Sequence, residues 1–115
     1  MTDEPLCEDL FDRLASEDPD RLVALLGTEM DPCDLTFAAA TAGERIQGHG
    51  VAEALLRLLS HPDRIVREGA LYGIAHHPSP AAVTRITEMA EHDESPSVNA
   101  VARETLEFWT PEFTR

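Results

Sequence analysis

The chain has few basic residues for its number of acidic ones. Its 115 residues include 9 Lys and Arg against 22 Asp and Glu, which gives a formal net charge of −13. A protein that binds nucleic-acid phosphates or an anionic membrane surface needs clustered cationic side chains, so this composition argues against both partners. A basic protein partner would be attracted instead. The same charge could also act only to keep the chain soluble.

The chain also has only two cysteines and no long apolar run. Cys7 and Cys33 are too few for a disulfide framework, and they lack the spacing of metal ligands. No apolar run approaches the roughly 20 residues of a membrane-spanning helix. Residues 1–5 are acidic, unlike the start of a signal peptide. Apolar and polar residues nowhere alternate as in a strand. We therefore expect one all-α domain over residues 1–115, located in the cytoplasm.

A pattern of residues occurs twice in the second half of the chain. A shift of 32 residues superimposes residues 51–74 on residues 83–106, with Val66 on Val98 and Ala70 on Ala102. A weaker copy, residues 31–43, aligns with the first at a shift of 31. A fixed period in this range is typical of proteins built from stacked helical repeats.

Capping residues and helical spacing predict the elements. Apolar residues at helical spacing predict a leading helix over residues 6–16. Three helical hairpins should follow, over about residues 18–43, 50–76 and 80–109. We expect Gly43 to end one helix and Pro111 to end the last, because both residues are typical of helix ends. The predicted helix starts are at Asp18, Asp31, Asp63, Ser79 and Ser95.

One helix in this series resembles the second-helix consensus of HEAT-like repeats, of the compact bacterial type. The residues that carry the resemblance are Asp63, Val66, Arg67, Ala70 and Ile74; the following copy has Asp93, Val98, Ala102 and Leu106, with Asn99 where the arginine would stand. The resemblance implies a right-handed α-solenoid of about three hairpin repeats whose second helices line the concave face. Proteins of this kind mostly bind other proteins.

Small residues gather on one face of the helix predicted to begin near Asp63. Gly69, Ala70 and Gly73 would let a neighbouring helix approach closely, as ridges-into-grooves packing requires. Glycine inside a helix costs up to about 1 kcal/mol relative to alanine, so close packing should compensate for it.

Helical angles also predict a partner-binding surface on the second helices. We expect Phe37, Leu71 and Tyr72 to be apolar anchors, with charged residues around them. The charged residues of this predicted site are Arg67, Glu68, Arg103 and Glu107. The alternative is that Phe37 and Leu71 pack against neighbouring helices. A second aromatic group, Phe108, Trp109 and Phe113, should cap the end of the core.

Histidine is the residue type that most suggests an enzyme. His76 and His77 could reach one metal ion at a helix end, but a solvated turn is the favoured interpretation. HEAT-like iron hydroxylases use His-Glu dipeptides, whereas this chain has only Glu91 followed by His92. Nothing marks a chromophore site, as in HEAT-like phycobilin lyases, or a phosphate-binding loop. The acidic pairs Asp18 with Asp20 and Asp93 with Glu94 are interpreted as helix caps.

These observations favour a non-enzymatic module that binds another protein through an acidic concave face, and the charge of that face would suit a basic partner. An immunity or antitoxin-like inhibitor of a basic toxin is an alternative within the same class. A HEAT-like enzyme that handles a metal or a chromophore is the alternative from another class. No catalytic, cofactor-binding or metal-binding residue is assigned, and no cofactor is expected.

Overall fold

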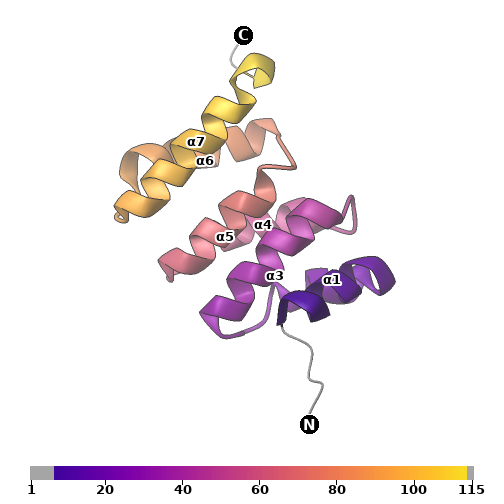
Figure 1. The fold of residues 1–115 in the computed structure, drawn as a ribbon. Coiled ribbons are helices and arrows are strands. Elements are labelled where there is room, and N and C mark those ends of the chain that lie inside the picture. The colour runs from indigo at the N-terminus through magenta and orange to yellow at the C-terminus, as the bar shows by residue number, and fades with distance from the viewer. Residues whose placement is uncertain (1–6, 114–115) are drawn as a thin grey trace.

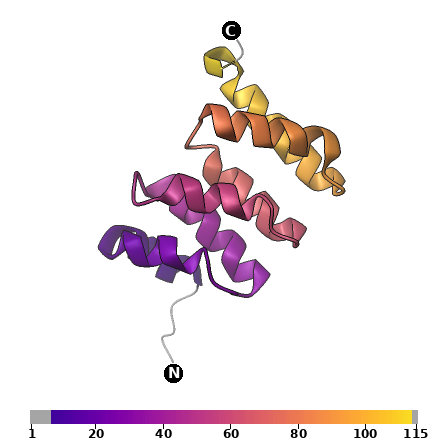
Figure 2. The same ribbon diagram turned by 180° about the vertical axis from the view of Figure 1, so that it is seen from behind.

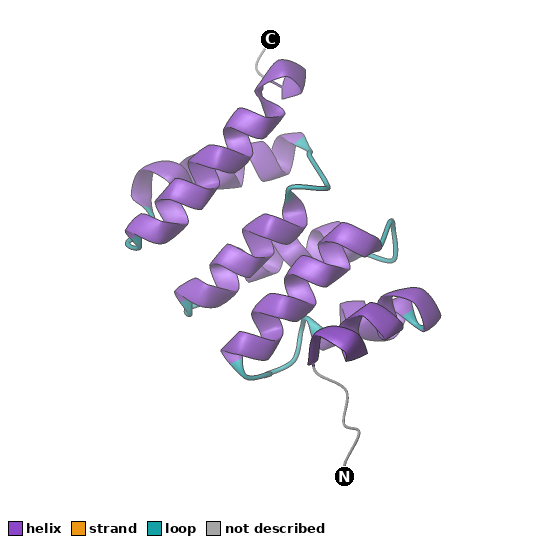
Figure 3. Ribbon diagram, in the orientation of Figure 1, coloured by secondary structure: helices purple, strands orange, loops and turns teal. Residues whose placement is uncertain are grey.

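The computed structural model describes residues 7–113, and this part of the chain contains seven α-helices and no strand (Figure 3). The all-α fold predicted from the sequence is therefore confirmed. The helices are α1 (Cys7–Glu17), α2 (Pro19–Leu25), α3 (Pro32–Arg45), α4 (Val51–Leu58), α5 (Arg64–Ile74), α6 (Pro80–His92) and α7 (Pro96–Phe113).

Side-chain caps start five of the helices where the sequence predicted. The caps accept hydrogen bonds from backbone N–H groups that have no partner within the helix. In α2, α3 and α6 the next residue is proline, whose missing N–H does no harm in the first turn. The capping residues are Asp18 for α2, Asp31 for α3, Asp63 for α5, Ser79 for α6 and Ser95 for α7.

The helices form a two-layer stack, which is the arrangement of an α-solenoid. α3, α5 and α7 lie side by side on one face of the molecule (Figure 1), and α4 and α6 lie on the opposite face (Figure 2). The leading helix α1 packs mainly against α3, so it extends the first layer at the N-terminal end. The stack is elongated, with extents of 52 × 27 × 20 Å.

α3 and α5 share the most extensive helix–helix contact, and glycine makes it possible. A Cβ atom on Gly43 would overlap the backbone of Gly73, and one on Gly73 would overlap the carbonyl of Ala39. A Cβ on Gly69 would lie 2.7 Å from the Cα of Thr36. The small face predicted for α5 is therefore a close backbone contact. The prediction that Gly43 ends its helix was wrong, because α3 continues to Arg45 and uses Gly43 for this contact.

The end of α7 also differs from the prediction. The helix continues through Pro111 to Phe113. Proline removes one backbone hydrogen bond from a helix, so continuation costs stability without being impossible. The connection between α3 and α4, residues 46–50, includes three successive residues with positive φ, Gly48, His49 and Gly50. His49 is held there by a 2.8 Å contact between its Nδ1 and Oδ1 of Asp20.

Candidate functional site

The predicted binding surface is only partly exposed, and Leu71 is the clearest correction. Leu71 has no exposed surface, so it is a core residue and not an apolar anchor. Its helix, α5, contacts α3, α4 and α7. Buried residues consequently occupy about 200° of α5, at about 100° per residue. A helical pattern that assumes one packed side therefore underestimates how much of a central helix is buried. After the first turn of α5, Glu68, Tyr72 and the C-terminal capping residue Ala75 are the residues that are not fully buried.

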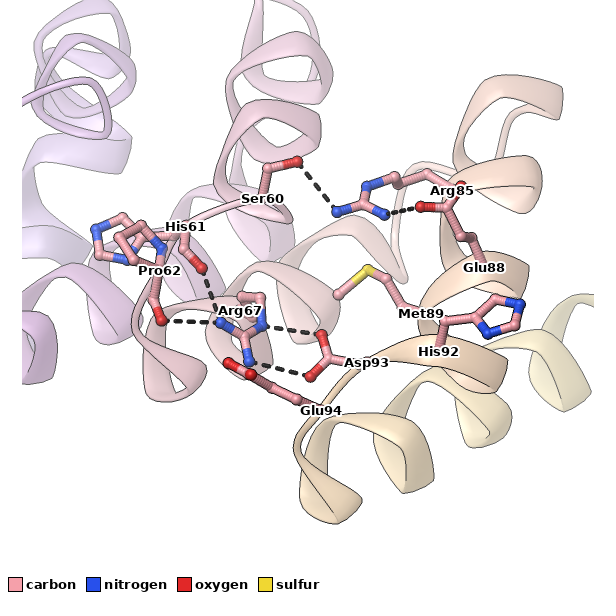
Figure 4. A pocket seen from close by; sticks show the side chains of 10 residues that line it. All are labelled: Ser60, His61, Pro62, Arg67, Arg85, Glu88, Met89, His92, Asp93 and Glu94. Carbon is pink, nitrogen blue, oxygen red and sulfur yellow. Dashed lines mark hydrogen bonds and ion pairs between the residues drawn. The ribbon is translucent and has the colours of Figure 1, made fainter.

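Arg67 is the second correction, because its side chain is only 8% exposed and is used inside the protein. Its guanidinium donates to both carboxylate oxygens of Asp93, from Nε at 2.9 Å and from Nη2 at 3.0 Å. Nη1 donates to the carbonyl oxygens of His61 and Pro62 (Figure 4). Asp93 therefore pairs with Arg67, and its Oδ1 also accepts the N–H of Ser95. This bidentate pair joins the turn before α5 to the turn before α7.

The neighbouring helices carry shorter polar residues near the position of Arg67. In α7 the amide of Asn99 donates to the carbonyl oxygens of Met89 and Asp93. It thereby stabilises the turn before α7, as Arg67 stabilises the turn before α5. In α3 the hydroxyl of Thr36 donates to the carbonyl of Ile65 at 2.9 Å. Only Arg67 reaches a carboxylate on the next hairpin. The arginine of the HEAT-like pattern is therefore a structural link in this chain.

A polar cavity of about 470 Å³ lies beside this link (Figure 4). Arg85 reaches into it and donates to Oε1 of Glu88 at 2.8 Å and to the hydroxyl of Ser60 at 3.1 Å. Both arginines of the cavity thus already have acceptors within the protein. This cavity lies at the junction between the α4–α5 and α6–α7 helix pairs.

The remaining predicted site residues lie closer to the surface. Glu68 is half-buried and accepts a hydrogen bond from the hydroxyl of Ser97 at the start of α7. Arg103 and Glu107 are exposed on α7. Phe37 is 45% exposed on α3, and Tyr72 is 55% exposed on α5. The structure therefore leaves Phe37 and Tyr72 as the exposed aromatic residues of the predicted set.

A groove of about 370 Å³ opens beside Tyr72, between α3, α5 and α7. Its walls are mainly apolar, and Phe108 of α7 forms one side while being 75% exposed itself. The prediction that Phe108 caps the core was wrong; of that predicted group Trp109 is buried, and the side chain of Phe113 lies outside the described part. The residues that line the groove are Ala40, Glu44, Tyr72, Ala75, His76, Val101, Glu104, Thr105 and Phe108.

The groove residues follow the repeat period, which is the signal that the sequence analysis missed. α3, α5 and α7 begin 32 residues apart, at Pro32, Arg64 and Pro96. Six of the residues that line the groove form two rows at this spacing. The first row is Ala40, Tyr72 and Glu104, and the second is Glu44, His76 and Phe108. Applying one period to all outward positions of the three helices would have found them.

The same alignment explains why the groove exists. α5 presents Gly69 and Gly73 to α3, and the equivalent positions of α7 are Val101 and Thr105. Both of these larger side chains line the groove. They prevent α7 from approaching α5 as closely as α5 approaches α3, so space remains between α5 and α7 on this face.

The two adjacent histidines have separate environments. His76 lines the groove, whereas Nε2 of His77 donates to the carbonyl oxygen of Gly43 at 2.7 Å. Because the ring of His77 is used to join the end of α5 to α3, the pair does not form one ligand site in this structure. Between residues 7 and 113 no group of three or more His, Cys, Asp or Glu side chains is placed to hold a metal ion.

Comparison with known proteins identifies one family. Residues 8–107 match the family model described as HEAT repeats, which covers all but the ends of the described helices. No curated protein and no solved structure matches the chain. None of the described helices is long and apolar enough to cross a membrane.

Proposed function

Because this chain belongs to the HEAT-repeat family, we propose that it is a non-enzymatic module that binds a partner protein on the face formed by α3, α5 and α7. HEAT repeats are commonly protein-interaction scaffolds, and catalysis is not general in the family. The binding face would consist of the second helix of each proposed repeat unit, α2–α3, α4–α5 and α6–α7.

The observation that carries this proposal is that each of these three helices exposes an aromatic side chain among its described residues. Phe37, Tyr72 and Phe108 are among the few large apolar residues exposed in the described part of the chain. We call these three residues the aromatic set; two of them, Tyr72 and Phe108, line the same groove. Exposed aromatic side chains offer large rigid contacts at small entropy cost, and they are enriched at the centres of protein interfaces.

The net charge of −13 favours a partner with a positive surface. An inhibitor that covers a basic toxin is one form of this proposal, in which the partner is a single cognate protein. A scaffold would instead bind a subunit of a larger assembly. Both forms use the same face, so the partner distinguishes them once it has been identified.

Tyr72→Ala tests the face. The substitution should leave the fold nearly intact, because the tyrosine is more than half exposed. It should weaken partner binding by about 2 kcal/mol or more, the range of interface hot spots. The measurement is affinity capture with tagged wild-type protein, followed by calorimetry with the purified partner and a thermal melt of each variant. Glu91→Gln, an exposed change on α6 in the opposite layer, is the control and should retain binding.

Two results would contradict the proposal. Equal affinity of the wild type and Tyr72→Ala would place the interface on another surface. A large loss of melting temperature in Tyr72→Ala would mean that the tyrosine stabilises the fold, and Phe108→Ala would then have to lose the partner without losing stability.

A further inference from the structure

The groove beside Tyr72 has a chemistry that limits what can bind there. Among the described residues that line it, Glu44 of α3 and Glu104 of α7 carry carboxylates, and none is an arginine. Its walls include the aromatic side chains of Tyr72 and Phe108. We infer that this groove binds the side chain of an arginine or a lysine in an exposed linear segment of the partner protein. The inference rests on the proposed function and names the chemistry of its ligand.

Three features of the groove favour a cation. Aromatic ring faces attract guanidinium and ammonium groups, and the attraction grows when the groups lose water. The carboxylates of Glu44 and Glu104 supply opposite charge from two sides of the groove. The groove also lies near the C-terminal ends of α3 and α5, where the helix dipoles contribute partial negative charge. All three act in the same direction, so a carboxylate or phosphate ligand would be repelled.

The basic residues near the groove do not cancel this charge. Arg45 follows Glu44 in sequence, but its Nε lies 3.4 Å from Oδ1 of Asp12 on α1. Arg103 is exposed on α7 and is not part of the lining. His76 is the basic residue within the lining, and its imidazole can accept a hydrogen bond as well as donate one.

The size of the groove favours a side chain over a larger element. Its volume of about 370 Å³ is near the lower end of typical ligand sites, which hold small molecules and not whole helices. The groove lining also includes the apolar side chains of Ala40, Ala75 and Val101. A segment with apolar residues beside the arginine or lysine would therefore bury more surface than an isolated cation would.

The test uses two acetylated and amidated peptides, Ala-Leu-Arg-Leu-Ala and the same peptide with citrulline in place of arginine. Citrulline keeps the shape of arginine and removes its charge. Each peptide is titrated into the complete ¹⁵N-labelled protein, and binding is followed by amide chemical shifts. The arginine peptide should bind about tenfold more tightly than the citrulline peptide. The largest shifts should occur at Tyr72, His76, Glu104 and Phe108.

Variants of the protein test whether the arginine peptide binds in the groove and not elsewhere on the acidic surface. The double variant Glu44→Gln with Glu104→Gln should lose most of the preference for arginine, whereas Glu91→Gln should keep it. Equal affinity for the two peptides, or shifts that cluster away from the groove, would overturn the inference. So would an arginine preference that both variants retain, because it would reflect only the net charge of the protein.

The outcome is separable from that of the proposed function. If Tyr72→Ala loses the partner protein but the two peptides bind equally, the face binds a protein and the inferred ligand is wrong. If Tyr72→Ala keeps the partner while the arginine peptide still binds in the groove, the groove chemistry is supported and the proposed interface is wrong.

Discussion

The two helix contacts of α5 are built differently. Toward α3, α5 presents Gly69 and Gly73, and the two helix backbones meet directly. Toward α7, the contact is smaller, and the equivalent positions of the approaching helix carry Val101 and Thr105. Polar links supplement the second contact, above all the pair of Arg67 with Asp93. The α3–α5 contact is therefore close-packed through the backbone, whereas the α5–α7 contact leaves a groove at the surface.

This difference indicates how a small repeat protein can be stable and still offer a site. Close backbone packing leaves no room for a ligand, but it stabilises the α3–α5 contact through dispersion and burial. The wider α5–α7 junction exposes Tyr72 and Phe108 beside a groove. Its stability then depends on a few hydrogen bonds, which single substitutions can remove. Three substitutions test this comparison, in decreasing order of expected effect.

Asp93→Ala should have the largest effect, about 3–5 kcal/mol of lost unfolding free energy, because it leaves the buried charge of Arg67 without its partner. Hydrogen exchange should rise first in α6 and α7, since the α3–α5 contact is untouched. Denaturant unfolding and amide exchange measure the two effects. The double variant Arg67→Met with Asp93→Ala is the control and should recover part of the stability, because no unpaired charge remains. A loss below about 1 kcal/mol in the single variant would show that the pair behaves as an exposed one.

Gly73→Ala should destabilise the protein by about 1–3 kcal/mol through overpacking, although alanine normally favours a helix over glycine. The added Cβ would overlap the carbonyl of Ala39, a backbone atom that cannot rotate away. Gly27→Ala is the matched control, because its nearest contact would be an ordinary 3.6 Å from the carbonyl of Ala24. Denaturant midpoints decide the result. A stabilised Gly73→Ala variant would mean that α3 and α5 are not in direct backbone contact.

Trp109→Phe should have the smallest effect, about 1–2 kcal/mol, because it removes the indole hydrogen bond and leaves part of the volume of a buried ring empty. The indole Nε1 donates to the carbonyl of Ala75 at 3.0 Å and so joins α7 to the end of α5. The loss should be visible in the midpoint of thermal unfolding and in faster exchange within α7. If amide exchange rises equally in α3 and α7, the helices unfold as one cooperative unit. The α3–α5 and α5–α7 contacts would then differ in structure but not in stability.

The residues of the candidate site were harder to predict than the helices that carry them. Phe37 and Tyr72 were predicted as exposed anchors, and both are exposed. Leu71 lies only one residue before Tyr72, yet it is fully buried. Phe108 was assigned to the core and is the most exposed of the three aromatic residues on the face. Helical angles give directions around one helix, but burial also depends on how many neighbours surround that helix.

Local chemistry in the sequence was sufficient for the helices and for one of their contacts. Asp18, Asp31, Asp63 and Ser79 determine helix starts because a side-chain oxygen satisfies nearby N–H groups wherever the helix is placed. The glycines of α5 required a close neighbour because their cost inside a helix needs compensation. Only the tertiary structure decided that Arg67 reaches Asp93, that Leu71 is covered and that Val101 and Thr105 hold a groove open. Each of these outcomes depends on the distance between two helices, which is set by all the side chains between them and by no single position.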